Sequence, residues 1–414
     1  MTTAASGGAL ARRLGTTDAV VIGLGAMIGA GVFAAFAPAA HAAGQWLLAG
    51  LAVAAVVAYC NATSSARLAA RYPSSGGTYV YGRERLGPFW GYLAGWSFVV
   101  GKTASCAAMA LTFAAYAAPG HERPAAVAAV LALTALNWRG VHKSALATRV
   151  IVVVVIAVLA AVVAAGLSSP ATANGDLLPD GPVPVAGVLQ AAGLLFFAFA
   201  GYARIATLGE EVRDPQRTIP RAIPIALLIT LVVYAAVAVT AILVLGTDRL
   251  AASTAPLADL VTAAGAGWLA PVVRVGAAVA ALGSLLALIL GVSRTTFAMA
   301  RDRHLPAVLD AVHPAHQVPH RAELAVGVLV AVLVSVVDLR GAIGFSSFGV
   351  LLYYGIANAA ALTLGRTENR PPRLVPIIGL AGCLLLAGSL PLPSTLFGAA
   401  VVGAGAVLYA VRRR

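Results

Sequence analysis

The feature that most constrains this sequence is a succession of long apolar runs separated by short polar segments. A helix of about 20 apolar residues crosses a lipid bilayer, and the chain contains twelve runs that approach or exceed this length. They cover residues 18–40, 46–66, 87–118, 124–138, 150–167, 185–207, 222–246, 266–298, 323–338, 342–364, 374–390 and 394–411. Only 10% of the residues are charged, whereas a soluble domain carries about 25%. A soluble enzyme, a secreted disulfide scaffold and a disordered protein are therefore excluded. We expect an all-α polytopic membrane protein with twelve transmembrane helices.

The basic residues predict how these spans are oriented. The formal net charge is +13, and with the N-terminus inside nearly all Lys and Arg fall in inner loops. The six exceptions are Arg123, Arg249 and Arg340 in outer loops and Lys102, Arg204 and Arg274 within spans. This asymmetry is the positive-inside pattern, and it explains the charge without a nucleic-acid partner. We therefore expect a multi-pass protein of the cell membrane, specifically a bacterial inner membrane, with both termini cytoplasmic.

Few residues inside the apolar runs could carry chemistry. Cys60, Cys106 and Cys383 are isolated, while the 15 acidic residues and seven histidines fall in loops or at the ends of runs. An intramembrane enzyme would need a nucleophile, a carboxylate or a metal cluster there, so we expect no enzymatic activity, no cofactor and no metal. A channel needs a selectivity filter and a primary pump a phosphate-binding loop, and neither pattern is present. A secondary transporter is the class that fits.

Glycines in the first and sixth runs predict interrupted helices. The first run holds Gly23, Gly25, Gly29 and Gly31, and glycine costs about 1 kcal/mol against alanine inside a helix. Either Gly25 and Gly29 form a small-residue packing face, or the helix unwinds locally and its backbone groups line a cavity. The sixth run has Gly201 at its middle. Two interrupted helices five spans apart are typical of an inverted repeat with a binding site at mid-membrane. Free N–H groups at one half-helix end and free carbonyls at another suit a zwitterion.

Five segments carry a resemblance to a known family. They are residues 25–33 (GAMIGAGVF), 72–81 (YPSSGGTYVY), 95–96 (GW), 209–220 (GEEVRDPQRTIP) and 294–303 at the end of the eighth run. With these segments the chain resembles permeases of the amino acid–polyamine–organocation (APC) superfamily along nearly its whole length. The resemblance implies a LeuT-like 5+5 inverted repeat with broken helices 1 and 6, plus two C-terminal helices. The expected divisions are a cytoplasmic tail 1–17, repeats 18–167 and 185–364, helices 11 and 12 in 374–411, and a tail 412–414.

The same resemblance implies a substrate site made mostly of backbone groups. The substrate carboxylate would meet the N–H groups of Gly29, Ala30 and Gly31, and the amino group would meet the carbonyls of Met27, Phe197 and Ala200. The full set of expected substrate-binding residues is Met27, Ile28, Gly29, Ala30, Gly31, Phe197, Ala200, Gly201 and Tyr202. The expected ligand is an amino acid or related amine, bound without a charged side chain.

The sequence also departs from the family pattern at three positions. Ala203 stands where many members have an acidic residue, Leu288 where basic-amino-acid exchangers often place a tryptophan gate, and Val155 where several relatives have a lysine. These departures and the apolar wall of the sixth run favour neutral amino acids. An exchanger of amines, polyamines or cationic amino acids is the alternative.

Three residues are candidates for coupling or gating: Lys102, Arg204 and Leu288. A cation at depth in the bilayer costs about 2.5–3.5 kcal/mol on insertion scales, so Lys102 is expected either to couple transport to a proton or to snorkel to the inner face. Arg204 either pairs with Glu211 or faces the cavity. The sequence leaves open the exact substrate, the coupling ion (proton, sodium or none), symport as against exchange, and the oligomeric state.

Overall fold

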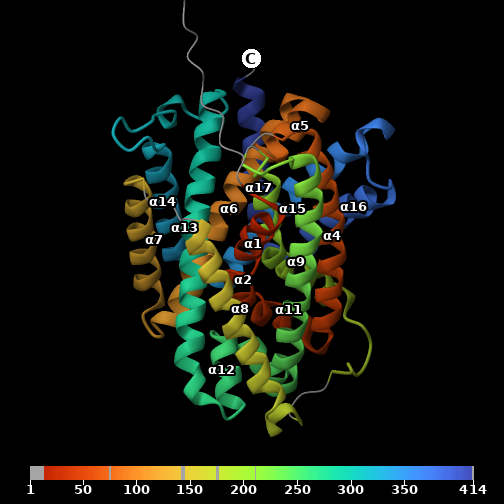
Figure 1. Ribbon diagram of the computed structural model, residues 1–414, viewed down its shortest axis with the longest axis vertical. Helices are drawn as coiled ribbons and strands as arrows, with labels where there is room; N and C mark the ends of the chain where they lie inside the picture. Colours follow the sequence, from red (N-terminus) through yellow and green to blue (C-terminus); the bar gives the residue numbers. More distant parts are fainter. Residues whose placement is uncertain (1–13, 74–75, 141–144, 174–176, 210, 413–414) are drawn as a thin grey trace, which may run out of the picture.

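The computed structural model of the chain describes residues 14–73, 76–140, 145–173, 177–209 and 211–412. Most of the expected N-terminal tail and residues 413–414 of the expected C-terminal tail lie outside the described residues. The described part is built almost entirely of helices, many of which lie side by side along the long axis of the molecule (Figure 1). This is the architecture that a bilayer imposes, because a helix satisfies its own backbone hydrogen bonds.

The helices follow the apolar runs closely. The α-helices are α1 (Thr16–Met27), α2 (Ala30–Ala34), α3 (Phe36–Ala43), α4 (Leu47–Arg71), α5 (Thr78–Leu86), α6 (Pro88–Ala117), α7 (Glu122–Trp138), α8 (Ala145–Leu167), α9 (Val185–Phe199), α10 (Ala203–Ala206), α11 (Pro215–Ala252), α12 (Pro256–Ala263), α13 (Ala270–Arg301), α14 (His320–Val336), α15 (Leu339–Leu362), α16 (Leu374–Ser389) and α17 (Leu392–Arg412). Three short 3₁₀ helices matter below: η3 (Ala200–Tyr202), η5 (Ala307–Leu309) and η6 (Arg366–Glu368).

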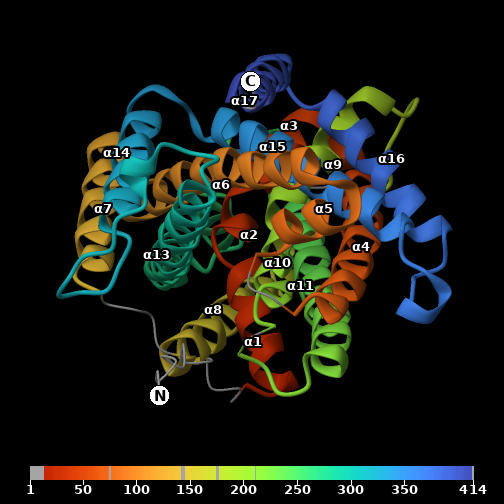
Figure 2. The same cartoon turned by 90° about the horizontal axis from the view of Figure 1, so that it is seen from above.

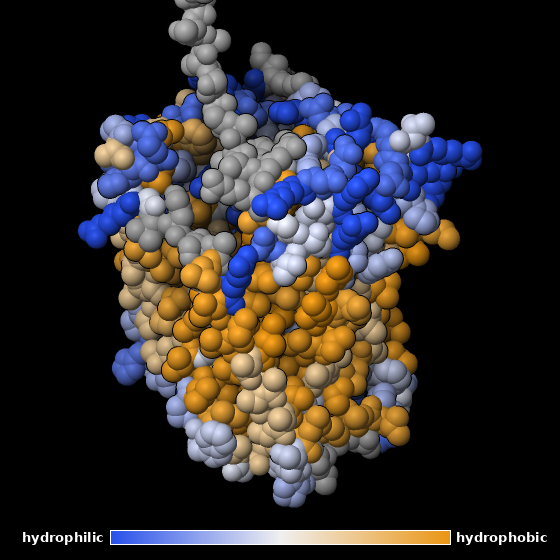
Figure 3. Space-filling view, viewed as in Figure 1, coloured by the Kyte–Doolittle hydropathy of each residue, from blue (hydrophilic) through white to orange (hydrophobic). Residues whose placement is uncertain are grey.

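The described residues contain nine stretches that are long and apolar enough to cross a membrane. The other three expected spans coincide with α7, α14 and α16, which have 17, 17 and 16 residues and lie at the short end of the range for a spanning helix. On the face drawn in Figure 3, an apolar band lies between two more hydrophilic ends. A polytopic helical membrane protein is confirmed, while the count of twelve spans stays a prediction.

The loops expected on the inner side lie together at one end of the molecule. Hydrogen bonds or ion pairs join Asp18 with Arg149, Arg71 and Arg85 with Glu368, Arg83 with Asp302, and Arg412 with Arg303. At the other end, the Arg274 guanidinium donates to the carbonyl of Tyr116, where α6 ends. Alternate loops therefore converge at opposite ends, as helices that repeatedly cross a layer require. Helix α5 and the end of α17 lie at the basic end, at the top of Figure 1.

Helices α6 and α15 pack side by side (Figure 2). A Cβ atom on Gly349 would lie 2.8 Å from the Cα atom of Gly101, so a side chain at position 349 would force the two helices apart. One turn further along, the hydroxyls of Ser105 and Ser346 lie 2.6 Å apart. This contact fixes α6 and its buried Lys102 against the helices that surround the first broken span.

Candidate functional site

The first span is interrupted where the glycines predict it. Helix α1 ends at Met27, and Ile28 and Gly29 leave the helical conformation, with ψ angles of 30° and −128°. The chain turns helical again at Ala30 and continues through α2 and α3. Since the first N–H groups of a helix lack partners within it, the backbone at Gly29, Ala30 and Gly31 can donate to a ligand. The structure therefore supports the interpretation that the glycines unwind the first span locally, rather than leaving it a continuous helix.

The sixth span is tightened rather than unwound, which differs from the expected broken helix 6. Helix α9 ends at Phe199, η3 follows, and α10 begins at Ala203, with backbone angles that stay right-handed helical on both sides of Gly201. The physical reason is composition, because a single glycine among alanine and tyrosine gives the chain little cause to leave helical geometry. A 3₁₀ segment inside a longer helix often marks a hinge, so the interruption is present in a weaker form.

The two interruptions lie against each other, with α1, α2 and α10 close together near the centre of Figure 2. A Cβ atom on Gly201 would lie 2.3 Å from the carbonyl oxygen of Ala26 and 2.6 Å from the nitrogen of Met27. A Cβ atom on Gly31 would lie 2.7 Å from Ala198. The glycines thus serve packing as well, because they let the backbones of the two spans touch.

Gly25 and Gly29 do not form a single small-residue packing face, which is the alternative interpretation of these glycines. A Cβ atom on Gly25 would meet Val152 of α8 at 3.0 Å, whereas one on Gly29 would meet the hydroxyl of Ser284 of α13 at 2.0 Å. The two glycines therefore face different helices. Gly29 places the backbone of the break directly beside Ser284, a residue that the sequence did not single out.

At both interruptions, tyrosine hydroxyls form hydrogen bonds with backbone carbonyl oxygens. Tyr234 of α11 has its hydroxyl 2.6 Å from the carbonyl oxygen of Met27 and 3.0 Å from that of Ala198. Tyr354 of α15 donates to the carbonyl of Ala200 at 3.0 Å. Two of the three carbonyls expected to meet the substrate amino group thus already accept a hydrogen bond, and each retains a second lone pair. Sequence reasoning missed these tyrosines because they lie far away in the chain, without a local motif.

The expected site residues are enclosed by protein. Residues 27–31, Ala200 and Tyr202 are buried, Phe197 is 8% exposed, and Gly201 is half-buried. The ring of Tyr202 stacks on that of Tyr354, with centroids 4.9 Å apart. The structure therefore brings the expected residues together around the two interruptions, with an apolar and aromatic surround.

Lys102 is buried deep in α6. Its side chain is 8% exposed, and among the described residues it has neither a hydrogen-bond nor an ion-pair partner. A snorkelling lysine would reach solvent, so this degree of burial speaks against that interpretation. An unpaired cation inside a membrane protein is costly and usually functional.

Arg204 and Leu288 take different environments. Arg204 is exposed, and the charges that act on it are those of Glu211 and Arg294. It forms no ion pair within the described part of the chain. Leu288 of α13 is half-buried and packs against the main core. Neither placement assigns the residue to the substrate site, and both stay candidates for coupling or gating.

One carboxylate is buried more deeply than the sequence indicates. Glu323, expected at the end of a span, is fully buried in the first turn of α14. Neither carboxylate oxygen has a hydrogen-bond partner among the described residues, and Arg294 is the charge that acts on it. The sequence could not show this burial, because Glu323 lies at the start of an apolar run and the exposure of a helix end depends on what packs beside it.

A group of ion pairs at the basic end is centred on Glu368. Glu368 of η6 receives hydrogen bonds from Arg85 and Arg71, and these with the N–H of Gly365 lower the pKa of Glu368 to about 2. Arg71 and Arg85 thus connect α4 and α5 to the segment between α15 and α16. No group of three or more His, Cys, Asp or Glu side chains is placed to hold a metal in the described residues.

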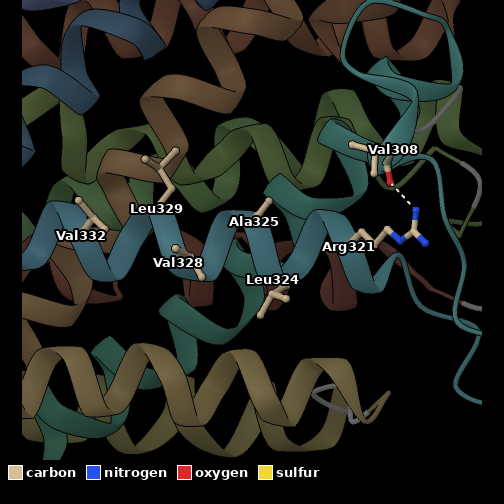
Figure 4. Close-up of a pocket in the computed structure, with 7 residues that line it drawn as sticks. All are labelled: Val308, Arg321, Leu324, Ala325, Val328, Leu329 and Val332. Atoms are coloured by element: carbon tan, nitrogen blue, oxygen red, sulfur yellow. Dashed lines mark hydrogen bonds between the residues drawn. The ribbon is translucent and has the colours of Figure 1, made fainter.

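An apolar groove of about 520 Å³ lies away from the interruptions, along the exposed face of α14 (Figure 4). It is lined by Val308, Arg321, Leu324, Ala325, Val328, Leu329 and Val332. Exposed apolar side chains on a peripheral helix are what contact with lipid requires. We therefore do not assign this groove to the substrate.

Comparisons with known proteins show the family to which this chain is similar. A family model described as amino acid permease matches residues 14–410. An uncharacterized transporter of Mycobacterium tuberculosis is 69% identical over 98% of this chain and 92% of its own length. The branched-chain amino acid permease of Bacillus subtilis is 27% identical, over 91% of this chain and 88% of its own. The vacuolar cationic amino acid transporter 4 of Arabidopsis thaliana is 30% identical, over 89% of this chain and 65% of its own.

Proposed function

Because the chain belongs to the amino acid permease family of the APC superfamily, we propose that it is a secondary transporter that moves neutral amino acids by alternating access. Membership makes it a multi-pass membrane transporter rather than an enzyme. The substrate, the mechanism and the cytoplasmic location of both termini are parts of the proposal. So is the 5+5 inverted repeat with its divisions at 18–167 and 185–364, followed by two C-terminal helices.

The observation that carries this proposal is the break at Ile28 and Gly29, buried beside the 3₁₀ segment at Gly201. The N–H groups of Gly29, Ala30 and Gly31 offer partial positive charge to a carboxylate. The carbonyls of Met27 and Ala200 offer partial negative charge to an ammonium group. The two ends of an amino acid backbone can therefore be bound without any charged side chain.

The surround of the site favours an uncharged side chain on the substrate. Phe197 and Tyr202 present apolar and aromatic surface, and Ala203 supplies no carboxylate next to the 3₁₀ segment. A cationic substrate would rely on a cation–π contact worth about 0.5–2 kcal/mol. The named relatives include a branched-chain permease and a cationic transporter, so leucine and arginine are the informative pair.

The test is uptake into liposomes that contain the purified protein. Labelled leucine and labelled arginine are supplied at equal concentration, with unlabelled substrate inside to permit exchange and with a pH gradient in a parallel series. Leucine is expected to enter faster, and faster uptake of arginine would replace the neutral class by the cationic alternative. Absence of uptake for amino acids and amines alike would contradict the transport proposal.

A matched pair of variants connects uptake to the site. Gly29→Val places a branched side chain at the break, while Gly403→Val changes a glycine of α17 whose Cβ position is open. Gly29→Val is expected to abolish leucine binding, and Gly403→Val to retain it. Binding of leucine by both variants with unchanged affinity would contradict the backbone site.

A further inference from the structure

A second cavity lies at the basic end of the molecule, remote from the interrupted spans. It has a volume of about 150 Å³ and is lined by Pro88, Tyr92, Arg303, His304, Tyr409 and Arg412. These residues come from the start of α6, the end of α17 and the turn after α13. Since a water molecule in the liquid occupies about 30 Å³, the cavity could hold a polar group several times that size.

The charge around this cavity is positive. Neither Arg303 nor Arg412 forms an ion pair within the described part of the chain, although the Arg412 guanidinium donates to the carbonyl of Arg303 at 3.4 Å. That contact holds the Arg412 guanidinium beside the backbone of Arg303, and both residues line the cavity. The adjacent acid, Asp302, already accepts the hydroxyl of Tyr79 at 2.5 Å and lies 3.7 Å from Arg83. The two lining arginines are therefore available to an anion.

The backbone adds to this positive field. Helix α6 has 30 residues and begins at Pro88, on the wall of the cavity. The start of a helix carries partial positive charge, although Pro88 itself has no N–H to donate. Two guanidinium groups and a helix start together favour an anion with several oxygen atoms, such as a phosphate ester.

Apolar side chains are exposed on the helices that supply the cavity's lining residues. Leu408 and Val411 of α17 are 47% and 64% exposed, and both lie within one turn of Arg412. Trp90, on the first turn of α6, is 43% exposed, as is common for tryptophan at a membrane interface. A cationic pocket close in the chain to exposed apolar side chains suits a molecule with an anionic head and a hydrocarbon tail.

We propose that this cavity binds the phosphate of an anionic phospholipid headgroup, whose acyl chains lie along α17. Arg303 and Arg412 hold the phosphate, and the lipid joins the end of α17 to the start of α6 and the turn after α13. The predicted inner side of the membrane, where basic loops meet anionic lipids, is the side on which the cavity opens. This site is independent of the proposed transport function.

The test measures lipid retention and thermal stability of the purified full chain. Native mass spectrometry records retained phosphatidylglycerol or phosphatidylcholine, and melting curves are taken in detergent with each lipid or with inorganic phosphate. Arg303→Gln/Arg412→Gln is compared with Arg366→Gln/Arg373→Gln, which removes the same charge from exposed positions around η6. Arg303→Lys/Arg412→Lys keeps the charge and checks that the pocket folds.

Phosphatidylglycerol is expected to be retained by the wild type and by the Arg366/Arg373 control. In the glutamine variant of the pocket, the affinity for phosphatidylglycerol should fall roughly fivefold for each arginine replaced, the equivalent of about 1 kcal/mol each. The lysine variant should recover most of the retention, and rising salt should weaken it in the wild type. Equal retention of phosphatidylcholine, equal loss in both glutamine variants, or stabilisation by inorganic phosphate but not by lipid would each overturn the proposal.

Discussion

At the scale of single residues, Gly29 has two roles that can be separated. It lets the break approach Ser284, since a Cβ atom there would lie 2.0 Å from the serine hydroxyl, and it keeps its N–H accessible to a ligand. Gly29→Ala should therefore lower stability by about 1–3 kcal/mol, the usual cost of overpacking. Ser284→Ala removes the clashing oxygen, so the double variant should regain most of that stability.

Substrate binding distinguishes the two roles. If the N–H at position 29 contacts the carboxylate, the double variant should melt near the wild-type temperature and still bind leucine more weakly. The measurements are melting curves and leucine titrations on wild type, both single variants and the double variant. Full recovery of leucine affinity together with stability would assign Gly29 to packing alone.

Lys102 and Glu323 form a second comparison at this scale. Both are buried, and neither has an ion-pair partner among the described residues. A buried lysine can exchange its proton as its surroundings change, so Lys102→Ala is expected to abolish the pH dependence of uptake, while Lys102→Arg remains charged and stops turnover. Glu323→Gln is the matched control, measured in the same liposomes across a series of pH values. A wild-type pH profile in Lys102→Ala and a flat one in Glu323→Gln would transfer the coupling role to the carboxylate.

At the scale of helices, the two interruptions show how composition sets the form of a break. Gly29 and Gly31 flank Ala30, and there the helix ends and restarts. Gly201 stands alone between Ala200 and Tyr202, and the chain only tightens to a 3₁₀ turn. The hydroxyls of Tyr234 and Tyr354 then satisfy carbonyls at each place. Carbonyls that a break releases in a membrane protein need such partners, because lipid supplies none.

Three elements at the basic end depend on one carboxylate. Glu368 of η6 pairs with Arg71 at the end of α4 and with Arg85 of α5, and its pKa is lowered to about 2. A lowered pKa means that the stabilisation is complete above the unfolded value of about 4.3 and is lost as pH falls toward 2. Glu368→Gln should thus lower the melting temperature at pH 7, and the difference from wild type should shrink between pH 5 and pH 3.

Salt provides the check on that interpretation. The arginine partners are partly exposed, so high ionic strength should reduce the effect of Glu368→Gln at pH 7. Glu122→Gln is a suitable control, since Glu122 accepts a hydrogen bond from the backbone N–H of Gly120 and, among the described residues, none from an arginine. A melting difference for Glu368→Gln that is unchanged by pH and salt would contradict the electrostatic origin.

At the scale of the whole molecule, the prediction concerns sidedness. Asp180 follows α8 at the end expected outside, whereas Arg373 precedes α16 at the basic end, and both are exposed. Asp180→Cys in cells should react with a membrane-impermeant maleimide, and Arg373→Cys should react only after permeabilisation. Native Cys60, Cys106 and Cys383 are buried, so background labelling should be low. The reverse labelling pattern would invert the predicted orientation.

The sequence by itself determined the class of structure. Its apolar runs and low charge require helices in a bilayer, and each run coincides with one helix or with a series of up to three helices, although α7, α14 and α16 are shorter than a typical span. The glycines at 29 and 31 also located the first break, since backbone preference is a local property. These features follow from short stretches of chain and from the solvent around it, so they can be read without tertiary contacts.

The tertiary structure alone decided which groups meet. Ser284, Tyr234 and Tyr354 reach the breaks from helices far away in the chain. Glu323 is buried although it lies at the start of a helix, and Arg303 and Arg412 come together across 109 positions. Burial and pairing depend on which helix faces pack together, and the pattern of apolar residues constrains that weakly in lipid, because every face of a spanning helix can be apolar.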